Sequence, residues 1–175
     1  MQSWHLRTNA DSEADVICLD SRTPRFEVSL GLDLIGKIER EIHDALGFGV
    51  VETGGYLLGH AWDYIVMRTG PGPRSQHSAD RFTLDDSHVR GWLNENPDLR
   101  IVGDWHVHTE SRDGVPSDTD LRGWAGHCGV SQNGYLGIIA TRGEEGMGFM
   151  TPRLHAWVTY REGEQAVCEP VVIRD

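Results

Sequence analysis

The sequence predicts an α/β or α+β fold in which one central mixed β-sheet is flanked by helices. Short apolar runs typical of strands recur along the chain, and segments with helical character are interspersed among them. At 175 residues the chain is most economically one domain with a hydrophobic core of its own. We expect residues 1–24 to form a tail or an edge strand, and residues 25–175 to form the domain.

Helices are expected in three places. From residue 32, apolar residues such as Leu34, Ile38 and Ile42 recur at steps of three and four, which is the period of an amphipathic helix that ends near Gly47. A second, shorter helix is expected over residues 84–94. A third begins at residue 118, directly after a Pro-Ser pair, and runs to about residue 128.

Strands are expected where short apolar runs are bounded by turn residues. The Gly54-Gly55 pair within one run predicts a bulge or the close approach of another backbone. Glu52 interrupts the same run and, taken alone, is best interpreted as a solvent-exposed charge on an edge strand. Pro170 similarly suggests an edge in the last strand. The expected strands cover residues 26–30, 49–60, 65–68, 99–108, 134–141, 154–160 and 166–173, with a loop over 74–81 and a turn over 143–148.

Two histidines at the end of an apolar strand are the most informative feature. Because residues i and i+2 of a strand point to the same face, the imidazoles of His106 and His108 should project together. Asp120 lies one helical turn beyond Ser117, within reach of the same point. Two imidazoles and one carboxylate predict a zinc site whose fourth position is open to water, as in catalytic sites. The pattern S-x-x-D is also a helix cap that needs no metal.

Composition excludes several classes of protein. The formal net charge of −11 disfavours nucleic-acid binding and fits a protein or peptide substrate better. No apolar run approaches the roughly 20 residues of a membrane helix, and no secretion signal is visible. The three cysteines, Cys18, Cys128 and Cys168, are odd in number and far apart, which predicts buried, reduced thiols in a cytoplasmic protein.

These motifs resemble those of the JAB/JAMM (MPN-plus) metallopeptidase family. That family has a glutamate on an early strand, then H-x-H, then S-x-x-D opening a helix. Here the pattern reads Glu52, His106 and His108, then Ser117 to Asp120. The resemblance covers residues 26–160 and implies the cytidine deaminase-like JAB/MPN fold.

Other parts of the sequence extend or limit the resemblance. The text E-T-G-G-Y-L-L-G, from Glu52 to Gly59, is similar to the family's glutamate strand, and G-P-G-P at 70–73 is similar to bacterial members. The chain departs from the family at Thr109, where proline is usual. Its loop between His108 and Ser117 is one residue longer than usual, a change that a loop accommodates at little cost.

The resemblance implies a reaction and a role for each residue. His106, His108 and Asp120 would hold one Zn²⁺ per chain. Glu52 would be the general base that takes a proton from water and passes it to the leaving amine. Ser117 would hydrogen-bond the oxyanion of the tetrahedral intermediate. The bond cleaved would be an amide or isopeptide that follows the C-terminal tail of a ubiquitin-like protein.

The resemblance also implies partners. It is greatest to small bacterial JAB proteins encoded beside E1- and E2-like enzymes in antiphage operons, including the type II CBASS deconjugase group. A ubiquitin-like protein, or a conjugate made by such enzymes, is therefore the expected substrate. Its flexible tail could add as a strand beside an exposed sheet edge near Gly54-Gly55. No nucleic acid or membrane partner is expected.

Two alternative functions use the same residues. Residues 104–114 also resemble the first motif of PHP-type metal phosphoesterases, but only His127 and His155 follow them, too few to complete a multinuclear cluster. An inactive MPN-type scaffold that binds partners would typically lack the ligands, which are all present here. A zinc nucleoside deaminase would need H-x-E and P-C-x-x-C, and the chain has neither.

Overall fold

The computed structural model has the mixed sheet and the three helices that the sequence predicts. It describes residues 4–5, 16–19, 24–30, 32–47, 52–77, 82–108, 114–128, 134–141, 143, 145–146, 149–150 and 152–174. The greater part of the expected N-terminal tail lies outside these residues, as do residues 49–51 of the expected glutamate strand and residues 109–113 of the long loop.

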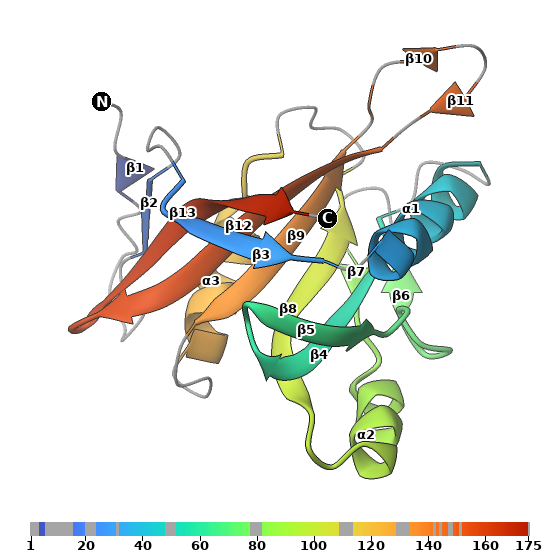
Figure 1. Cartoon of the computed structure of the whole chain (residues 1–175), viewed down its shortest axis with the longest axis horizontal. Helices are drawn as coiled ribbons and strands as arrows, with labels where there is room; N and C mark the ends of the chain where they lie inside the picture. The colour runs from blue at the N-terminus through green and yellow to red at the C-terminus, as the bar shows by residue number, and fades with distance from the viewer. Residues whose placement is uncertain are drawn as a thin grey trace.

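Nine strands form one sheet in the order β1-β2-β13-β12-β9-β8-β4-β5-β3 (Figure 1). Because β3 also pairs with β13, the seven strands from β13 to β3 close into a ring. Both parallel and antiparallel strand pairs occur around the ring, so the sheet is mixed. The strands of the sheet are β1 (Trp4–His5), β2 (Val16–Cys18), β3 (Phe26–Ser29), β4 (Gly54–Ala61), β5 (Tyr64–Arg68), β8 (Arg100–Val107), β9 (Tyr135–Thr141), β12 (Arg153–Glu162) and β13 (Gln165–Arg174).

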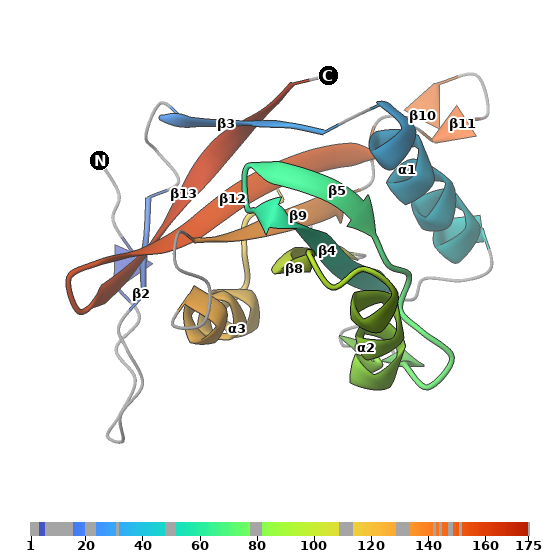
Figure 2. The same ribbon diagram turned by 60° about the horizontal axis from the view of Figure 1, so that its bottom comes forward.

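The helices are α1 (Leu32–Gly47), α2 (Asp86–Glu95) and α3 (Asp118–Cys128). Asp85 caps α2, since its side chain accepts hydrogen bonds from the backbone N–H groups of Ser87 and His88. In Figure 2, α2 and α3 lie below the sheet while α1 lies beside its upper part. The predicted boundaries of all three helices agree with the structure to within two residues.

Two hydrophobic clusters lie on opposite faces of the sheet. On β9, Leu136 and Ile138 belong to the cluster inside the ring, where α1 contributes Ile38 and Ile42. The alternate β9 residue Ile139 belongs to a second cluster under α3. This alternation is expected of a strand that is buried on both faces. The second face also carries the candidate site, because His106 is the register partner of Ile139.

Glycines allow the backbone to pack closely around β4. A Cβ at Gly55 would lie 1.9 Å from the carbonyl oxygen of Thr69, so the predicted close approach of another backbone is confirmed. That carbonyl accepts a hydrogen bond from Nε1 of the buried Trp105 at 3.0 Å. Gly54 and Gly55 pair with His106 and Trp105 of β8, whereas the pairing of β4 with β5 begins only at Leu57. The docking of a substrate tail near Gly54-Gly55 stays a prediction.

Three smaller features differ from the sequence-based expectation. The expected loop over 74–81 contains β6 (Gln76–His77), which pairs with β7 (Phe82–Thr83). The expected turn over 143–148 contributes β10 (Glu145–Gly146) to a hairpin with β11 (Phe149–Met150). Strand β13 is not an edge strand, and Pro170 lies where its partner changes from β2 to β3. A residue without an N–H is tolerated at such a gap.

The structure also tests two expectations from composition, namely buried cysteines and the lack of a membrane-spanning helix. Cys18, Cys128 and Cys168 are buried and are not joined in disulfides, which confirms the predicted buried thiols. Within the part of the chain that the structure describes, no helix has both the length and the apolar character needed to cross a bilayer.

Candidate metal centre

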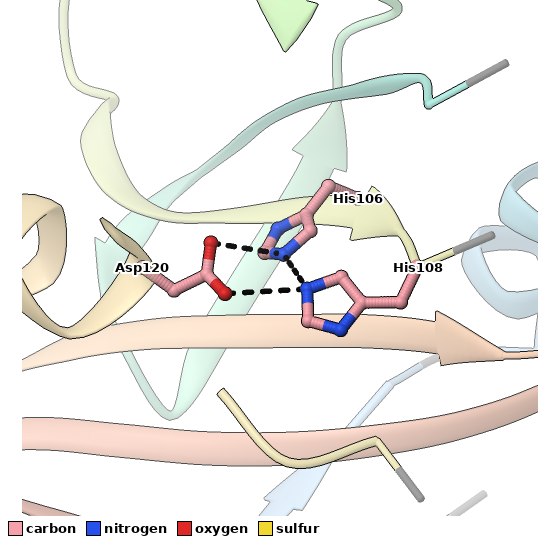
Figure 3. A group of neighbouring side chains, drawn as sticks. All are labelled: His106, His108 and Asp120. Carbon is pink, nitrogen blue, oxygen red and sulfur yellow. Dashed lines mark hydrogen bonds and ion pairs between the residues drawn. The ribbon is translucent and has the colours of Figure 1, made fainter. Parts of the chain in front are cut away.

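The two histidines lie at the C-terminal end of β8, in the middle of the sheet. His106 is the register partner of Gly54 on β4 and of Ile139 on β9. His108 follows the last residue of β8, and its N–H donates to the carbonyl of Ala140 at 2.9 Å, which extends the strand geometry by one residue. Both imidazoles therefore project from the same face, toward α3 (Figure 3).

The start of α3 holds the carboxylate. The backbone N–H of Ser117 donates to Oδ2 of Asp120 at 2.7 Å, and the N–H of Asp120 faces Oγ of Ser117 at 3.3 Å. The Ser117 carbonyl accepts the first helical hydrogen bond, from Leu121. This reciprocal arrangement is a capping box with aspartate in the third helical position. The interpretation of S-x-x-D as a cap is therefore confirmed, and the cap also fixes the direction of the Asp120 side chain.

Three side chains converge at one point (Figure 3). The Nε2 atoms of His106 and His108 lie 3.0 Å apart. Oδ1 of Asp120 is 3.2 Å from Nε2 of His106, and Oδ2 is 3.2 Å from Nε2 of His108. The side chains are 6%, 12% and 16% exposed for His106, His108 and Asp120, so the cluster is largely shielded but keeps some surface open to solvent.

The spacing of these atoms suits a single zinc ion. Two nitrogen ligands of a tetrahedral zinc ion, each 2.0–2.1 Å from the metal, are about 3.3 Å apart. The three separations in the cluster are 3.0–3.2 Å, close to that value. Two imidazoles and one carboxylate also form the donor set of catalytic zinc sites, which leave one position for water. The metal-binding role of these residues stays a prediction, but their chemistry and spacing fit it.

The side chains of the cluster shift one another's pKa values. Burial acts to lower the pKa of His106, but hydrogen bonds and charge interactions with Asp104 and Asp120 outweigh it and raise this pKa to about 10. For Asp120, burial acts to raise the pKa, and hydrogen bonds from His106 and His108 outweigh it, so this pKa lies far below its usual range.

Glu52 lies beside the cluster but outside it. The carbonyl of Thr53 accepts a hydrogen bond from the N–H of Val107 at 2.9 Å, so the chain entering β4 runs antiparallel to the histidine segment. The Glu52 side chain is half-buried, and the adjoining strand β4 is internal to the sheet. These observations contradict the interpretation of Glu52 as a solvent-exposed charge on an edge strand. Its role as a general base stays a prediction, as does the oxyanion role of Ser117.

Asp104 is a neighbour of the cluster that the sequence argument did not single out. Its Oδ1 is 3.3 Å from Nδ1 of His106, and its Oδ2 accepts a hydrogen bond from Nε1 of Trp124 at 2.9 Å. The signal was present in the sequence, because Asp104 precedes His106 by two residues in the same strand and must share its face. What the sequence could not show is the distance from that face to Trp124 on α3.

The loop before α3 is anchored on β12 through two further residues. The carbonyl of Gly114 accepts a hydrogen bond from Nε1 of Trp157 at 2.9 Å. A Cβ at Gly114 would lie 2.1 Å from the His155 ring, and the φ angle of Gly114 is +63°, so glycine is required on two counts. His155 and Trp157 therefore act in packing, and they position the loop that leads to Ser117.

The remaining histidine positions do not extend the cluster. His127 stacks on Tyr135 with ring centroids 4.8 Å apart, and Nε2 of His155 lies 3.2 Å from Oγ1 of Thr141. Within the described ranges, His106, His108 and Asp120 form the single group of three or more potential ligands whose donor atoms lie within 4.8 Å of one another. A multinuclear cluster of the phosphoesterase type gains no support from this arrangement.

Comparison with known proteins agrees with the fold and the site. Residues 40–160 match the protein family described as prokaryotic homologs of the JAB domain. The matched segment runs from within α1 into β12, and it contains the three clustered residues together with Glu52 and Ser117. A search of curated proteins finds no match to this sequence. Because the family match covers more than half of the chain and includes the whole site, this protein belongs to the prokaryotic JAB-domain family.

Proposed function

We propose that this protein is a zinc-dependent peptidase or isopeptidase that cleaves a ubiquitin-like protein after its C-terminal tail. The observation that carries the proposal is the convergence of Nε2 of His106, Nε2 of His108 and the carboxylate of Asp120. Membership of the JAB-domain family supports hydrolysis of an amide bond as the reaction. The substrate is a conjugate or a linear precursor, both of which have an amide bond at the end of the tail, an isopeptide bond in the first and a peptide bond in the second.

Different residues of the chain would bind the metal, transfer the proton and stabilise the oxyanion during hydrolysis. His106, His108 and Asp120 would hold a zinc ion, which would supply Lewis acidity for the scissile carbonyl and lower the pKa of bound water toward about 7. Glu52, beside the cluster, accepts a proton from the attacking water and returns it to the leaving amine. The Ser117 hydroxyl lies at the exposed start of α3 and donates a hydrogen bond to the developing oxyanion.

Partners follow from the substrate class. A negative net charge and the absence of a basic patch motif favour a protein substrate, whose tail would approach the open side of the cluster. If E1- and E2-like enzymes make the conjugates, this protein reverses their action, and an antiphage operon is the proposed setting. Finding genes for such enzymes next to the gene for this chain would support that setting.

Metal content is the first test. Elemental analysis of protein purified without chelators should find about one zinc per chain, as expected for a single three-ligand site. Asp120→Asn keeps an oxygen that can cap α3 but loses the charge, so it should bind less zinc. Asp118→Asn, in the same helical turn and exposed, is the matched control and should bind zinc normally. A wild-type protein without zinc after zinc is supplied would contradict the proposal and favour a partner-binding scaffold.

Activity is the second test. The substrates are ubiquitin-like proteins, each joined through its C-terminal tail to a reporter by an amide bond. Glu52→Gln should retain zinc and lose cleavage, whereas Glu95→Gln, at an exposed position near the end of α2, should leave cleavage unchanged. Full activity of Glu52→Gln on a substrate that the wild type cleaves would remove Glu52 from the mechanism. Two or three metals per chain would reopen the phosphoesterase alternative.

A further inference from the structure

One carboxylate contacts both elements that supply the cluster. Asp104 lies on β8 with His106, and its two oxygens have different partners. Oδ1 lies 3.3 Å from Nδ1 of His106, while Oδ2 accepts the hydrogen bond from Nε1 of Trp124 on α3 at 2.9 Å. Strand β8 supplies both imidazoles, and α3 supplies Asp120. Asp104 therefore bridges the two halves of the candidate metal centre.

The Trp124 side of this bridge is rigid. Trp124 lies four residues after Asp120, so the two side chains lie on the same face of α3. Its ring is 2% exposed and rests directly over Gly137, where a Cβ would lie 2.0 Å from a ring atom. The ring centroids of Trp124 and His106 are 6.2 Å apart. A large side chain seated this closely holds Oδ2 of Asp104 in one place.

The contact with His106 selects which ring nitrogen faces the cluster. A carboxylate next to Nδ1 is an acceptor, so Nδ1 must carry a proton, and Nε2 is then the nitrogen left to bind a metal. The Nε2 atom is indeed the one that points toward His108 and Asp120. Carboxylate partners of metal-bound histidines commonly orient the imidazole in this way.

We propose that Asp104 is a positioning residue for zinc binding in this chain. It orients His106 so that Nε2 faces the metal, and through Trp124 it holds α3 so that Asp120 reaches the same ion. The inference rests on the proposed metallopeptidase function. It goes further by assigning a task to a residue outside the predicted ligand and catalytic set, and to an indole N–H on the helix.

Location argues against a purely structural role for this carboxylate. Asp104 is 16% exposed and lies on a sheet face whose neighbouring positions include Gly137 and the buried Tyr135. Placing a carboxylate among such groups is costly unless it is hydrogen-bonded, and an apolar residue would fill the same place without that cost. Its contacts with Nδ1 of His106 and Nε1 of Trp124 offset the cost of burying this carboxylate.

The test measures zinc affinity by competition with a chromophoric chelator. Removing a carboxylate of this kind typically weakens metal binding about 10- to 100-fold, and we expect that range for Asp104→Ala. Asp104→Asn, which has one acceptor oxygen for two donors, should fall between this variant and the wild type. Trp124→Phe keeps a ring over Gly137 but lacks the N–H, so it should lose less affinity than Asp104→Ala. Asp98→Ala, at an exposed position in the turn before β8, is the control.

A spectroscopic measurement separates positioning from simple stabilisation. In long-range proton–nitrogen NMR spectra of the zinc-loaded wild type, Nδ1 of His106 should carry a slowly exchanging proton. In folded Asp104→Ala this proton should exchange faster. A purely structural role would lower the thermal stability of the metal-free protein, without changing this signal or the zinc affinity of the folded fraction.

The outcomes distinguish this inference from the proposed function. If the wild type binds zinc and Asp104→Ala binds it equally well with the same His106 signal, the positioning role is wrong and the metallopeptidase proposal stands. If Asp104→Ala does not fold, the decision passes to Asp104→Asn, and unchanged zinc affinity in that folded variant overturns the inference. If the wild type binds no zinc, the proposed function itself fails.

Discussion

Ser117 and Asp120 hydrogen-bond each other in both directions: the Ser117 N–H donates to Oδ2 of Asp120 at 2.7 Å, and the Asp120 N–H faces Oγ of Ser117 at 3.3 Å. The first contact places one oxygen of the carboxylate, and the second closes the first turn of α3. Helix capping and ligand placement thus involve the same two residues. A change at Ser117 should consequently affect stability as well as the metal centre.

The two roles of Ser117 can be separated by substitution. Ser117→Ala removes the capping oxygen and should lower the free energy of unfolding by about 1 kcal/mol. Ser117→Asn retains a capping oxygen, so its unfolding free energy and zinc content should stay near those of the wild type. If the hydroxyl also contacts the oxyanion, Ser117→Asn should still lose kcat. Thermal unfolding, zinc content and kcat measured on both variants decide this, and a wild-type kcat in Ser117→Asn would limit Ser117 to capping.

Gly114→Ala should disturb the loop that leads to α3. The new Cβ would meet the His155 ring, and the φ angle of +63° disfavours any residue with a Cβ. We expect a loss of at least about 1 kcal/mol in unfolding free energy, because an alanine at a positive φ is strained. Zinc affinity should fall as well, since the Trp157 hydrogen bond to this loop would shift.

Gly123 provides the control for that substitution. It lies within α3, and a Cβ there meets no atom within 4 Å. Gly123→Ala should raise the unfolding free energy by up to about 1 kcal/mol through helix propensity. Chemical denaturation of both variants measures the two effects. Equal behaviour of Gly114→Ala and Gly123→Ala would show that the loop tolerates a side chain at residue 114.

Zinc should stabilise the folded protein. A ligand that binds the folded state alone adds about 2.7 kcal/mol at 100 times its Kd. The melting temperature should therefore rise by several degrees with zinc and return to the metal-free value with a chelator. Asp120→Asn should show a smaller rise, and Asp118→Asn should behave as the wild type. Differential scanning calorimetry checks this, and a melting temperature independent of zinc would oppose a metal site.

Alkaline pH should destabilise the protein partly through Cys128. Burial raises the pKa of this thiol to about 11, and the thiol donates to the carbonyl of Thr159 at 3.0 Å. In the unfolded chain the thiol ionises near about 8.5. Between these values the unfolded state binds fewer protons, so stability is full below about pH 8.5 and falls as pH rises toward 11, with a slope of at most about 1.4 kcal/mol per pH unit.

Cys128→Ser isolates this contribution. Serine keeps a donor for the Thr159 carbonyl but does not ionise in this range, so the fall in stability between pH 9 and 11 should be shallower. The unfolding free energy at several pH values, measured by urea denaturation, gives both curves. Parallel curves for the two proteins would assign the alkaline loss to other groups, such as Tyr160, whose pKa burial raises to about 12.

Local sequence patterns were sufficient to predict most of the elements. The helix α1 and the buried strand β9 each have a period or an apolar run that is decisive within their own length. Strand geometry alone brings His106 and His108 to one face, and the S-x-x-D pattern alone predicts the cap formed by Ser117 and Asp120. The meeting of Asp120 with the two histidines was expected from the donor set and the family resemblance, and it depends on how α3 packs against the sheet.

Contacts between distant segments were not predictable in the same way. Asp104 acquires its place through Trp124, and Gly114 through His155 and Trp157, and each of these contacts depends on how α3 and β12 pack against the sheet. The two-residue strands β6 and β10 are too short to have a period. Pairing of β3 with β13 joins segments far apart in the chain, and no local pattern specifies such a partner.

That last pairing has a consequence for how the protein is made. Strand β3 leaves the ribosome long before β13, because most of the sheet lies between them in the chain. Contacts between residues this distant in sequence form slowly, because a long stretch of chain must be ordered first. During translation β3 therefore remains unpaired with β13 while the intervening strands are synthesised. Ribosome-stalled chains that end before β13 should remain sensitive to proteases, and the ring should close only once β13 has left the ribosome.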